Sequence, residues 1–403
     1  MLNIFKRLQT GGEVRILSAA PSRPEIAQGN RRHFGANEHE KPGSELSDAR
    51  PMGRGATGHR SERKTAVSEL ATIARAMVAP GRGILAADES TPTITKRFDS
   101  IQVESTEENR RSYREMLFTT AGAEEFISGV ILFDETIRQS TSSGTPVPEL
   151  LTRKGILPGI KVDKGAKDLP FAPGEKVTEG LDGLRERVAE YRQLGARFAK
   201  WRAVINIGDN IPSSDCIRAN AHALARYSAL CVEGELVPIV EPEVIMDGSH
   251  TIERCHEVTE RVLGAVFAEL REQRVPLNEI VLKPNMVLSG STCPTQASVR
   301  DVAEATLVCF RKTVPEEVPG IVFLSGGQSD EMATAHLNEM NKLGGVPWEL
   351  SFSYGRALQS APLKTWAGNA ANVPAAQKAY LHRARCNGAA RSGTYTEEME
   401  RAA

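Results

Sequence analysis

The sequence predicts an α/β protein: a single (β/α)8 barrel of the TIM type, preceded by a disordered N-terminal extension. Eight short apolar runs recur from residue 66 onward, and helical stretches with apolar residues at three-and-four spacing separate most of them. Charged or hydroxyl residues stand within or at the ends of these runs. In a parallel barrel the strand ends converge on one C-terminal mouth, where the chemistry takes place. A doubly wound sheet is the alternative.

The chain divides near residue 65. Residues 1–64 are rich in Arg, Gly, Pro, Ser and Asn and show little apolar periodicity, so we expect a disordered extension. Residues 1–8, with Arg15 and Arg23, have the character of an organelle presequence. Acidic residues such as Glu13 and Glu25 argue against that reading. A dispensable tail and a misplaced start codon are therefore alternatives to organelle targeting for this extension. Residues 65–403 form the expected barrel with a C-terminal tail.

The expected strands follow in order, and each is a short run of apolar and β-branched residues. They cover residues 83–88, 129–134, 159–164, 198–202, 237–243, 280–287, 320–326 and 348–354. Two clear amphipathic helices are expected at residues 181–194 and 251–272.

Bulk composition excludes several classes of function. The chain has 403 residues, 40% of them hydrophobic, and a formal net charge of −1. A near-neutral charge argues against nucleic acid or an anionic membrane surface as the main partner, and no apolar run approaches the length of a bilayer span. The six cysteines are scattered without C-x-x-C spacing, as in reduced cytosolic proteins. A cytoplasmic protein is expected.

Lys283 stands in residues 280–287, a run that otherwise predicts a buried strand. A full charge there is unfavourable, so the amine is expected to lose its proton easily and to attack carbonyl carbons. Taken alone, a lysine that extends to solvent or pairs with a carboxylate is the simpler reading.

Residues two apart in a strand share a face, which groups further charged residues at the predicted mouth. Lys161 lies with Asp163, Lys200 with Arg202, Glu241 with Glu243, and Asp88 with Ala86. Neighbouring cations are expected to lower the pKa of the amines, and desolvation to raise that of the carboxylates. This set suits amine attack on a ketone, with Lys283 as nucleophile and Glu241 moving protons. A structural salt-bridge network is the alternative.

Two glycine turns after the last strands indicate phosphate binding. Ser325 and Gly326 follow one strand, and Ser353, Gly355 and Arg356 lie at the end of the next. Exposed backbone N–H groups and a forked guanidinium bind anions, and barrels of this architecture often bind phosphate there. The sequence therefore predicts a phosphorylated carbonyl substrate.

Seven motifs in order resemble class I (Schiff-base) fructose-bisphosphate aldolase, over roughly residues 70–395. They lie at residues 83–90, 159–165, 200–202, 241–243, 282–287, 324–329 and 352–357. The resemblance implies reversible cleavage of fructose 1,6-bisphosphate to dihydroxyacetone phosphate and glyceraldehyde 3-phosphate in glycolysis and gluconeogenesis. It also implies no metal, no cofactor and a homotetramer. The eight histidines contain no H-x-H or H-x3-H pair, consistent with the absence of a metal site.

The resemblance implies a role for each matching residue. Lys283 would form the Schiff base, and Glu241, with Glu243 and Lys200 beside it, would handle protons. Asp88 would take the C4 hydroxyl proton. The expected phosphate-binding and substrate-binding residues are Lys161, Ser90, Thr93, Arg202, Ser325, Gly326, Ser353, Gly355 and Arg356.

The chain departs from the family at two places. Animal and plant members end in a tyrosine that helps to move the C3 proton, whereas this chain ends in Ala403. Tyr395 or a water would have to replace it. Pro92 and Thr93 stand where familiar animal sequences have Gly-Ser, so the loss of an N–H is expected to alter contacts to the 6-phosphate.

Other functions remain to be weighed. A transaldolase or deoxyribose-phosphate aldolase would also use a strand lysine, but the paired phosphate signals disfavour both. A non-catalytic scaffold would be expected to lose Lys283, Asp88 or Glu241, and all three are present. Sedoheptulose 1,7-bisphosphate and fructose 1-phosphate stay open as further substrates.

Overall fold

The computed structural model describes residues 68–401. The expected extension, its targeting alternative and the boundary near residue 65 lie outside these residues and stay predictions.

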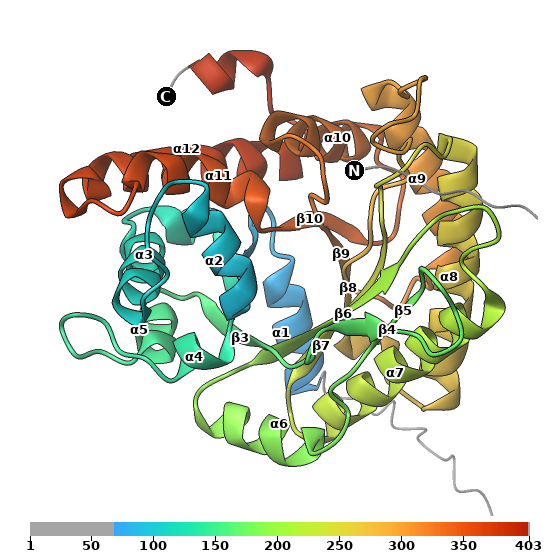
Figure 1. Ribbon diagram of the computed structural model, residues 1–403, viewed down its shortest axis with the longest axis horizontal. Helices are drawn as coiled ribbons and strands as arrows, with labels where there is room; N and C mark the ends of the chain where they lie inside the picture. The colour runs from blue at the N-terminus through green and yellow to red at the C-terminus, as the bar shows by residue number, and fades with distance from the viewer. Residues whose placement is uncertain (1–67, 402–403) are drawn as a thin grey trace, which may run out of the picture. The chain divides into compact units, whose positions relative to one another are not determined.

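Eight parallel strands close into a barrel in the order β1-β10-β9-β8-β7-β6-β3-β2 (Figure 1). Every run that the sequence analysis expected contributes one strand, which confirms the barrel and excludes a doubly wound sheet. The strands are β1 Gly83–Ala87, β2 Ile127–Leu132, β3 Leu157–Lys161, β6 Phe198–Ile205, β7 Val237–Val244, β8 Val281–Leu282, β9 Gly320–Phe323 and β10 Glu349–Tyr354.

Helices surround the strands (Figure 1). Hydroxyl side chains such as Ser68, Thr106, Ser213 and Thr251 cap several of them by accepting from an N–H of the first turn, which fixes where each helix starts. The α-helices are α1 Glu69–Met77, α2 Thr91–Asp99, α3 Glu107–Thr119, α4 Asp134–Ile137, α5 Val147–Arg153, α6 Leu184–Gln193, α7 Ser214–Glu233, α8 Ile252–Glu272, α9 Val299–Thr313, α10 Asp330–Leu343, α11 Arg356–Trp366 and α12 Val373–Arg391. The 3-10 helices are η1 Ala123–Glu125, η2 Leu277–Glu279, η3 Ala370–Asn372 and η4 Glu397–Arg401.

The two predicted helices are α6 and α8, with ends within a few residues of those expected. Two strands were not expected: β4 Ala166–Asp168 and β5 Lys176–Thr178 form an antiparallel hairpin in the connection after β3. Each is only three residues long, and its side chains are largely exposed or half-buried. A pattern that short carries no usable periodicity, which is why sequence analysis missed it.

The expected strand at residues 280–287 is much shorter than predicted, because β8 covers only Val281–Leu282. Lys283 N still donates to Val240 O (2.8 Å), but Pro284 has no N–H with which to continue the ladder. Side chains replace the missing pairing: Asn285 Oδ1 accepts from Val244 N at 3.0 Å. The segment stays buried without being a strand.

An apolar layer closes the barrel at the end opposite the mouth. Side chains of α1 pack there against inward residues of the strands, including Ile84, Phe198, Val237 and Val281. The Phe198 ring occupies the space beside Gly159, where a Cβ would clash with it. The strands therefore begin in a packed core, and their other ends are left to build a site.

Candidate active site

All fourteen residues that the sequence analysis selected line one cavity at the C-terminal mouth, with a volume of about 510 Å3. They come from loops and strand ends as far apart in the chain as β1 and β10. They are Asp88, Ser90, Thr93, Lys161, Lys200, Arg202, Glu241, Glu243, Lys283, Ser325, Gly326, Ser353, Gly355 and Arg356.

Lysines and carboxylates alternate across the floor of the cavity. Lys283 Nζ lies 3.1 Å from Glu241 Oε1, and Lys200 Nζ lies 3.3 Å from Glu241 Oε2 and 2.6 Å from Asp88 Oδ2. The side chains of Lys283, Glu241 and Lys200 are each at most 5% exposed. Glu241 Oε2 has no hydrogen-bond partner among the residues described, although it faces Lys200.

Strand register explains why these side chains meet. Lys161 pairs with Lys200 across β3 and β6, and Arg202 pairs with Glu241 across β6 and β7. Arg202 also forms an ion pair with Glu243. Because the strands are parallel, residues near their ends lie at one level.

The electrostatics differ from the sequence-based expectation. Burial alone would raise the pKa of Asp88, but the charges of Lys200 and Lys283 bring that pKa well below its usual range. Burial would likewise lower the pKa of Lys200, yet the facing carboxylates Asp88 and Glu241 raise it. The expected raised carboxylate and lowered amine pKa values are wrong for these two residues. Opposite charges at 2.6 Å outweigh both desolvation and the repulsion between amines.

The loops after β9 and β10 form one rim of the cavity. Gly326 has a φ of 50°, a left-handed conformation that suits glycine, and its carbonyl accepts from the Arg356 guanidinium. Gly355 is the N-cap of α11 and supplies no side-chain cap, so the first N–H groups of that helix have no capping side chain. The buried Ser353 hydroxyl has no partner in the described part of the chain. Free donors of this kind suit a phosphate.

The adjoining rim is the start of α2, which follows β1, the strand that neighbours β10. Pro92 lies in the first turn, where a helix does not use the missing N–H. Ser90 Oγ and Thr93 Oγ1 are 3.1 Å apart, and both hydroxyls line the cavity. Two cations that sequence analysis missed, Lys96 and Arg97, line it as well. Their spacing of three and four residues from Thr93 is the helical signal that could have found them.

Tyr395 is not among the residues that line this cavity. Its side chain is buried, and its hydroxyl donates to Glu400 Oε1 at 2.9 Å. In this arrangement the phenol does not reach the cavity, which argues against Tyr395 as the group that moves the C3 proton.

A closed parallel barrel with buried lysine–carboxylate contacts at its C-terminal mouth belongs to the (β/α)8 enzymes, which carry their active sites there. The comparisons with known proteins narrow this class. Residues 69–403 match the glycolytic family described as fructose-bisphosphate aldolase class-I. The chain belongs to this family of carbon–carbon lyases, as the seven motifs predicted.

Similar proteins from distant organisms carry the name of the same family. The chain is 61% identical over 330 residues to "Probable fructose-bisphosphate aldolase class 1" of Xanthomonas axonopodis pv. citri, covering 82% of this chain and 99% of that protein. It is 53% identical over 333 residues to the cytosolic fructose-bisphosphate aldolase 4 of Arabidopsis thaliana, covering 82% and 85%. Fructose-bisphosphate aldolase from Plasmodium falciparum, solved in complex with TRAP and a small molecule inhibitor, superimposes with a TM-score of 0.80 at 52% identity, covering 81% and 95%. Within residues 68–401 no helix has the length and apolar character needed to cross a membrane.

Proposed function

We propose that this protein cleaves fructose 1,6-bisphosphate reversibly to dihydroxyacetone phosphate and glyceraldehyde 3-phosphate through a Schiff base on Lys283. The observation that carries the proposal is the buried Lys283 amine, 3.1 Å from Glu241 Oε1. An amine beside a proton-transfer group can attack a ketone and lose water. Membership in the aldolase family supports the same chemistry.

The proposed cycle begins when Lys283 attacks the C2 carbonyl. Glu241 protonates the departing hydroxyl group of the carbinolamine, and an iminium forms with release of water. Lys200 holds the charge of Glu241 in place, and Glu243, two residues further along β7, pairs with Arg202. The alternation of charges on the cavity floor supports these roles, because each proton carrier has a fixed partner.

Carbon–carbon cleavage follows from Asp88. Its carboxylate takes the C4 hydroxyl proton, the C3–C4 bond breaks, and the electron pair enters the iminium to give an enamine. Glyceraldehyde 3-phosphate leaves, C3 is reprotonated, and hydrolysis frees dihydroxyacetone phosphate from Lys283. Its position at the cavity floor supports this role: Asp88 is ionised at neutral pH and can accept a proton, although its lowered pKa makes it a weaker base than an ordinary aspartate. A water is the proposed source of the C3 proton, since Tyr395 is occupied by Glu400.

The two rims would hold the two phosphates. We assign the 1-phosphate to Ser325, Gly326, Ser353, Gly355 and Arg356. We assign the 6-phosphate to Ser90 and Thr93 at the start of α2 and to Lys161 and Arg202 on β3 and β6. Each rim offers hydroxyl or backbone donors beside a cation, which is the pattern that binds phosphate.

Borohydride trapping tests the mechanism. Protein incubated with dihydroxyacetone phosphate in excess EDTA and then reduced is expected to carry a stable adduct on Lys283, located by peptide mass spectrometry. Fructose 1-phosphate and sedoheptulose 1,7-bisphosphate, assayed in parallel, would define the substrate range. Absence of the adduct, together with loss of cleavage in EDTA, would overturn the Schiff-base assignment.

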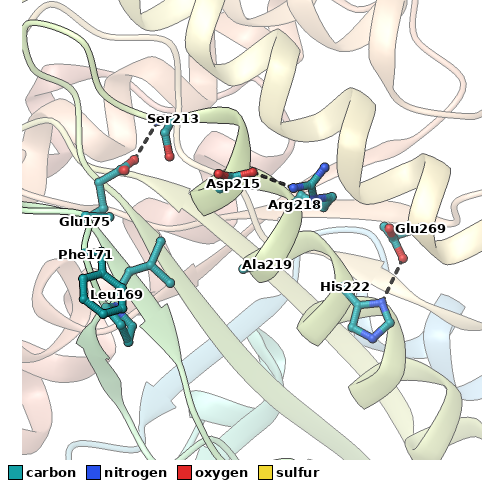
Figure 2. A pocket seen from close by; sticks show the side chains of 11 residues that line it. Leu169, Phe171, Glu175, Ser213, Asp215, Arg218, Ala219, His222 and Glu269 are labelled. Atoms are coloured by element: carbon teal, nitrogen blue, oxygen red, sulfur yellow. Dashed lines mark hydrogen bonds and ion pairs between the residues drawn. The ribbon is translucent and has the colours of Figure 1, made fainter. Parts of the chain in front are cut away.

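We also propose a cytoplasmic homotetramer that acts in glycolysis and gluconeogenesis. A fully exposed aromatic ring, Phe171 in the β4–β5 connection, supports assembly. It lies beside a surface pocket of about 810 Å3 that is shared with α7 and α8 (Figure 2). Light scattering should give four times the chain mass of 43.8 kDa, and Phe171→Ser should shift the mass downward. A wild-type mass of one chain would contradict the tetramer.

A further inference from the structure

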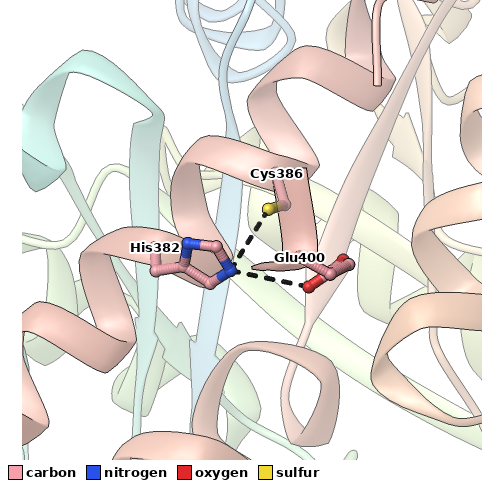
Figure 3. Close-up of side chains that lie close together, drawn as sticks. All are labelled: His382, Cys386 and Glu400. Atoms are coloured by element: carbon pink, nitrogen blue, oxygen red, sulfur yellow. Dashed lines mark hydrogen bonds and ion pairs between the residues drawn. The ribbon is translucent and has the colours of Figure 1, made fainter. Parts of the chain in front are cut away.

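Three potential metal ligands meet outside the cavity, where α12 contacts η4. His382 and Cys386 lie one turn apart on α12, so their side chains share a face. Glu400, in η4, completes the group (Figure 3). Nothing in the proposed aldol chemistry uses these residues, and the sequence gives only an H-x3-C spacing that is weak by itself.

The distances within this group fit one metal ion. His382 Nε2 lies 3.7 Å from Cys386 Sγ and 3.5 Å from Glu400 Oε2, and all three donor atoms are within 4.8 Å of one another. Bond lengths of ordinary tetrahedral zinc sites place neighbouring donors roughly 3.4–3.6 Å apart. Two of the three separations are therefore close to those of a zinc site before any ion binds.

Neighbouring residues hold the carboxylate in this position. Tyr395 Oη donates to Glu400 Oε1 at 2.9 Å, and Arg383 Nη1 contacts both carboxylate oxygens at 2.6 Å. Oε1 can keep both partners while Oε2 turns to a metal. Outer contacts of this kind orient the ligands of metal sites. The arrangement also shows why an ordinary ion pair between Arg383 and Glu400 is the competing explanation.

We propose that His382, Cys386 and Glu400 bind a Zn2+-type divalent ion that fastens the C-terminal segment to α12. Thiolate and imidazole ligands favour Zn2+ over Mg2+ or Ca2+, which prefer oxygen. A water would complete the four ligands. The side chains of His382 and Glu400 are 15% and 21% exposed, so an ion can reach them from solvent.

Binding forms a metal–sulfur bond and releases the thiol proton to the buffer. The thiolate and Glu400 then contribute two negative charges to the bound set, and the Arg383 guanidinium beside Glu400 contributes one positive charge. The ion takes no part in aldol cleavage, which is assayed in EDTA.

Cobalt titration of the full chain, stripped by a chelator and dialysed, tests the site. We expect one equivalent of Co2+ per chain to produce a sulfur-to-cobalt charge-transfer band, and Zn2+ to displace it. The band reports a cysteine ligand, so histidines elsewhere in the chain, including those before residue 68, cannot imitate it. Zn2+ is also expected to raise the melting temperature.

Two variants locate the site. Cys386→Ser should abolish the band and the thermal shift, and His382→Gln should weaken apparent Co2+ affinity at least about tenfold. His256→Gln is the matched control, because His256 faces Glu260 at 3.8 Å on α8 without a cysteine partner in the same group. It should leave the titration unchanged. A wild-type protein without the band, or a band that survives Cys386→Ser, would overturn the proposal.

Discussion

The two ends of the barrel interior use the same strands for opposite purposes. On β6, Phe198 points into the apolar layer, and Lys200 and Arg202, two and four residues later, line the mouth. On β7 the inward series runs from Val237 and Ile239 to Glu241 and Glu243. Position along a strand therefore decides whether an inward residue supports the fold or the chemistry.

The difference follows from the solvent each end meets. The closed end is sealed by α1, whose buried Ala74 and Met77 belong to the same apolar cluster as the inward strand residues, so this end can stabilise the fold through packing. The mouth holds buried charges that are unfavourable unless they are paired. The apolar layer thus supplies the stability that lets the mouth keep Lys283, Glu241, Lys200 and Asp88 together. Substitutions at one end of the barrel should therefore affect activity or stability without changing the other.

The largest effect is expected from Lys283→Met at the mouth. Loss of the nucleophile removes the covalent pathway, so turnover should fall by more than the roughly 10²–10⁴-fold typical of one acid–base group. Steady-state cleavage and circular dichroism would be measured together. Lys312→Met, at an exposed lysine on α9, serves as control and should keep full activity. Normal turnover by the Lys283 variant would remove this residue from the mechanism.

Asp88→Asn is expected to separate imine formation from cleavage. The variant should still be trapped by borohydride with dihydroxyacetone phosphate, while kcat falls about 10²–10⁴-fold. Because the pKa of Asp88 is lowered, its carboxylate stays ionised above its usual pKa of 3.8, and wild-type cleavage should not be lost through this group between pH 7 and 5. The ionised carboxylate also stabilises the fold above that pH, and this contribution is lost only as pH falls through the lower folded value. An equal loss of borohydride trapping and of cleavage would contradict the role of Asp88 in the cleavage step.

Gly159→Ala changes the closed end alone. The new Cβ meets the Phe198 ring, so the free energy of unfolding should drop by about 1–3 kcal/mol through overpacking. Activity per folded molecule should change little. The matched control is Gly264→Ala on α8, where a Cβ meets nothing within 4 Å and helix propensity should make the change neutral or stabilising. A Gly159 variant with normal stability would show that the packed layer is looser than described.

The smallest effect is expected from Arg356→Lys on the rim. A lysine keeps the charge but loses the fork that binds phosphate through two parallel bonds. KM should rise about tenfold, roughly 1.4 kcal/mol of binding, while kcat and the melting temperature stay near wild type. Initial rates over a range of substrate concentration would show this. A change confined to kcat would place Arg356 in the chemical step instead.

The sequence by itself predicted the barrel, its eight strands and fourteen of the residues that line the mouth, although not Lys96 and Arg97. The strands could be predicted because each is a short apolar run, and the site residues because they lie within or beside seven motifs that resemble one family. Sequence patterns did not predict the β4–β5 hairpin, because its strands are only three residues long and show no periodicity. They also did not predict the early end of β8, because the apolar run continues past Pro284 although that residue has no N–H for the ladder.

Only the tertiary structure decided the charge states and the long-range groupings. The pKa values of Asp88 and Lys200 depend on separations that strand register sets across the barrel, so their direction could not be inferred from residue type. Lys96 and Arg97 reach the cavity because α2 turns them toward it. Glu400 meets His382 and Cys386 because η4 folds back onto α12. Distance and burial govern electrostatics and ligand geometry, and both arise only when distant segments pack together.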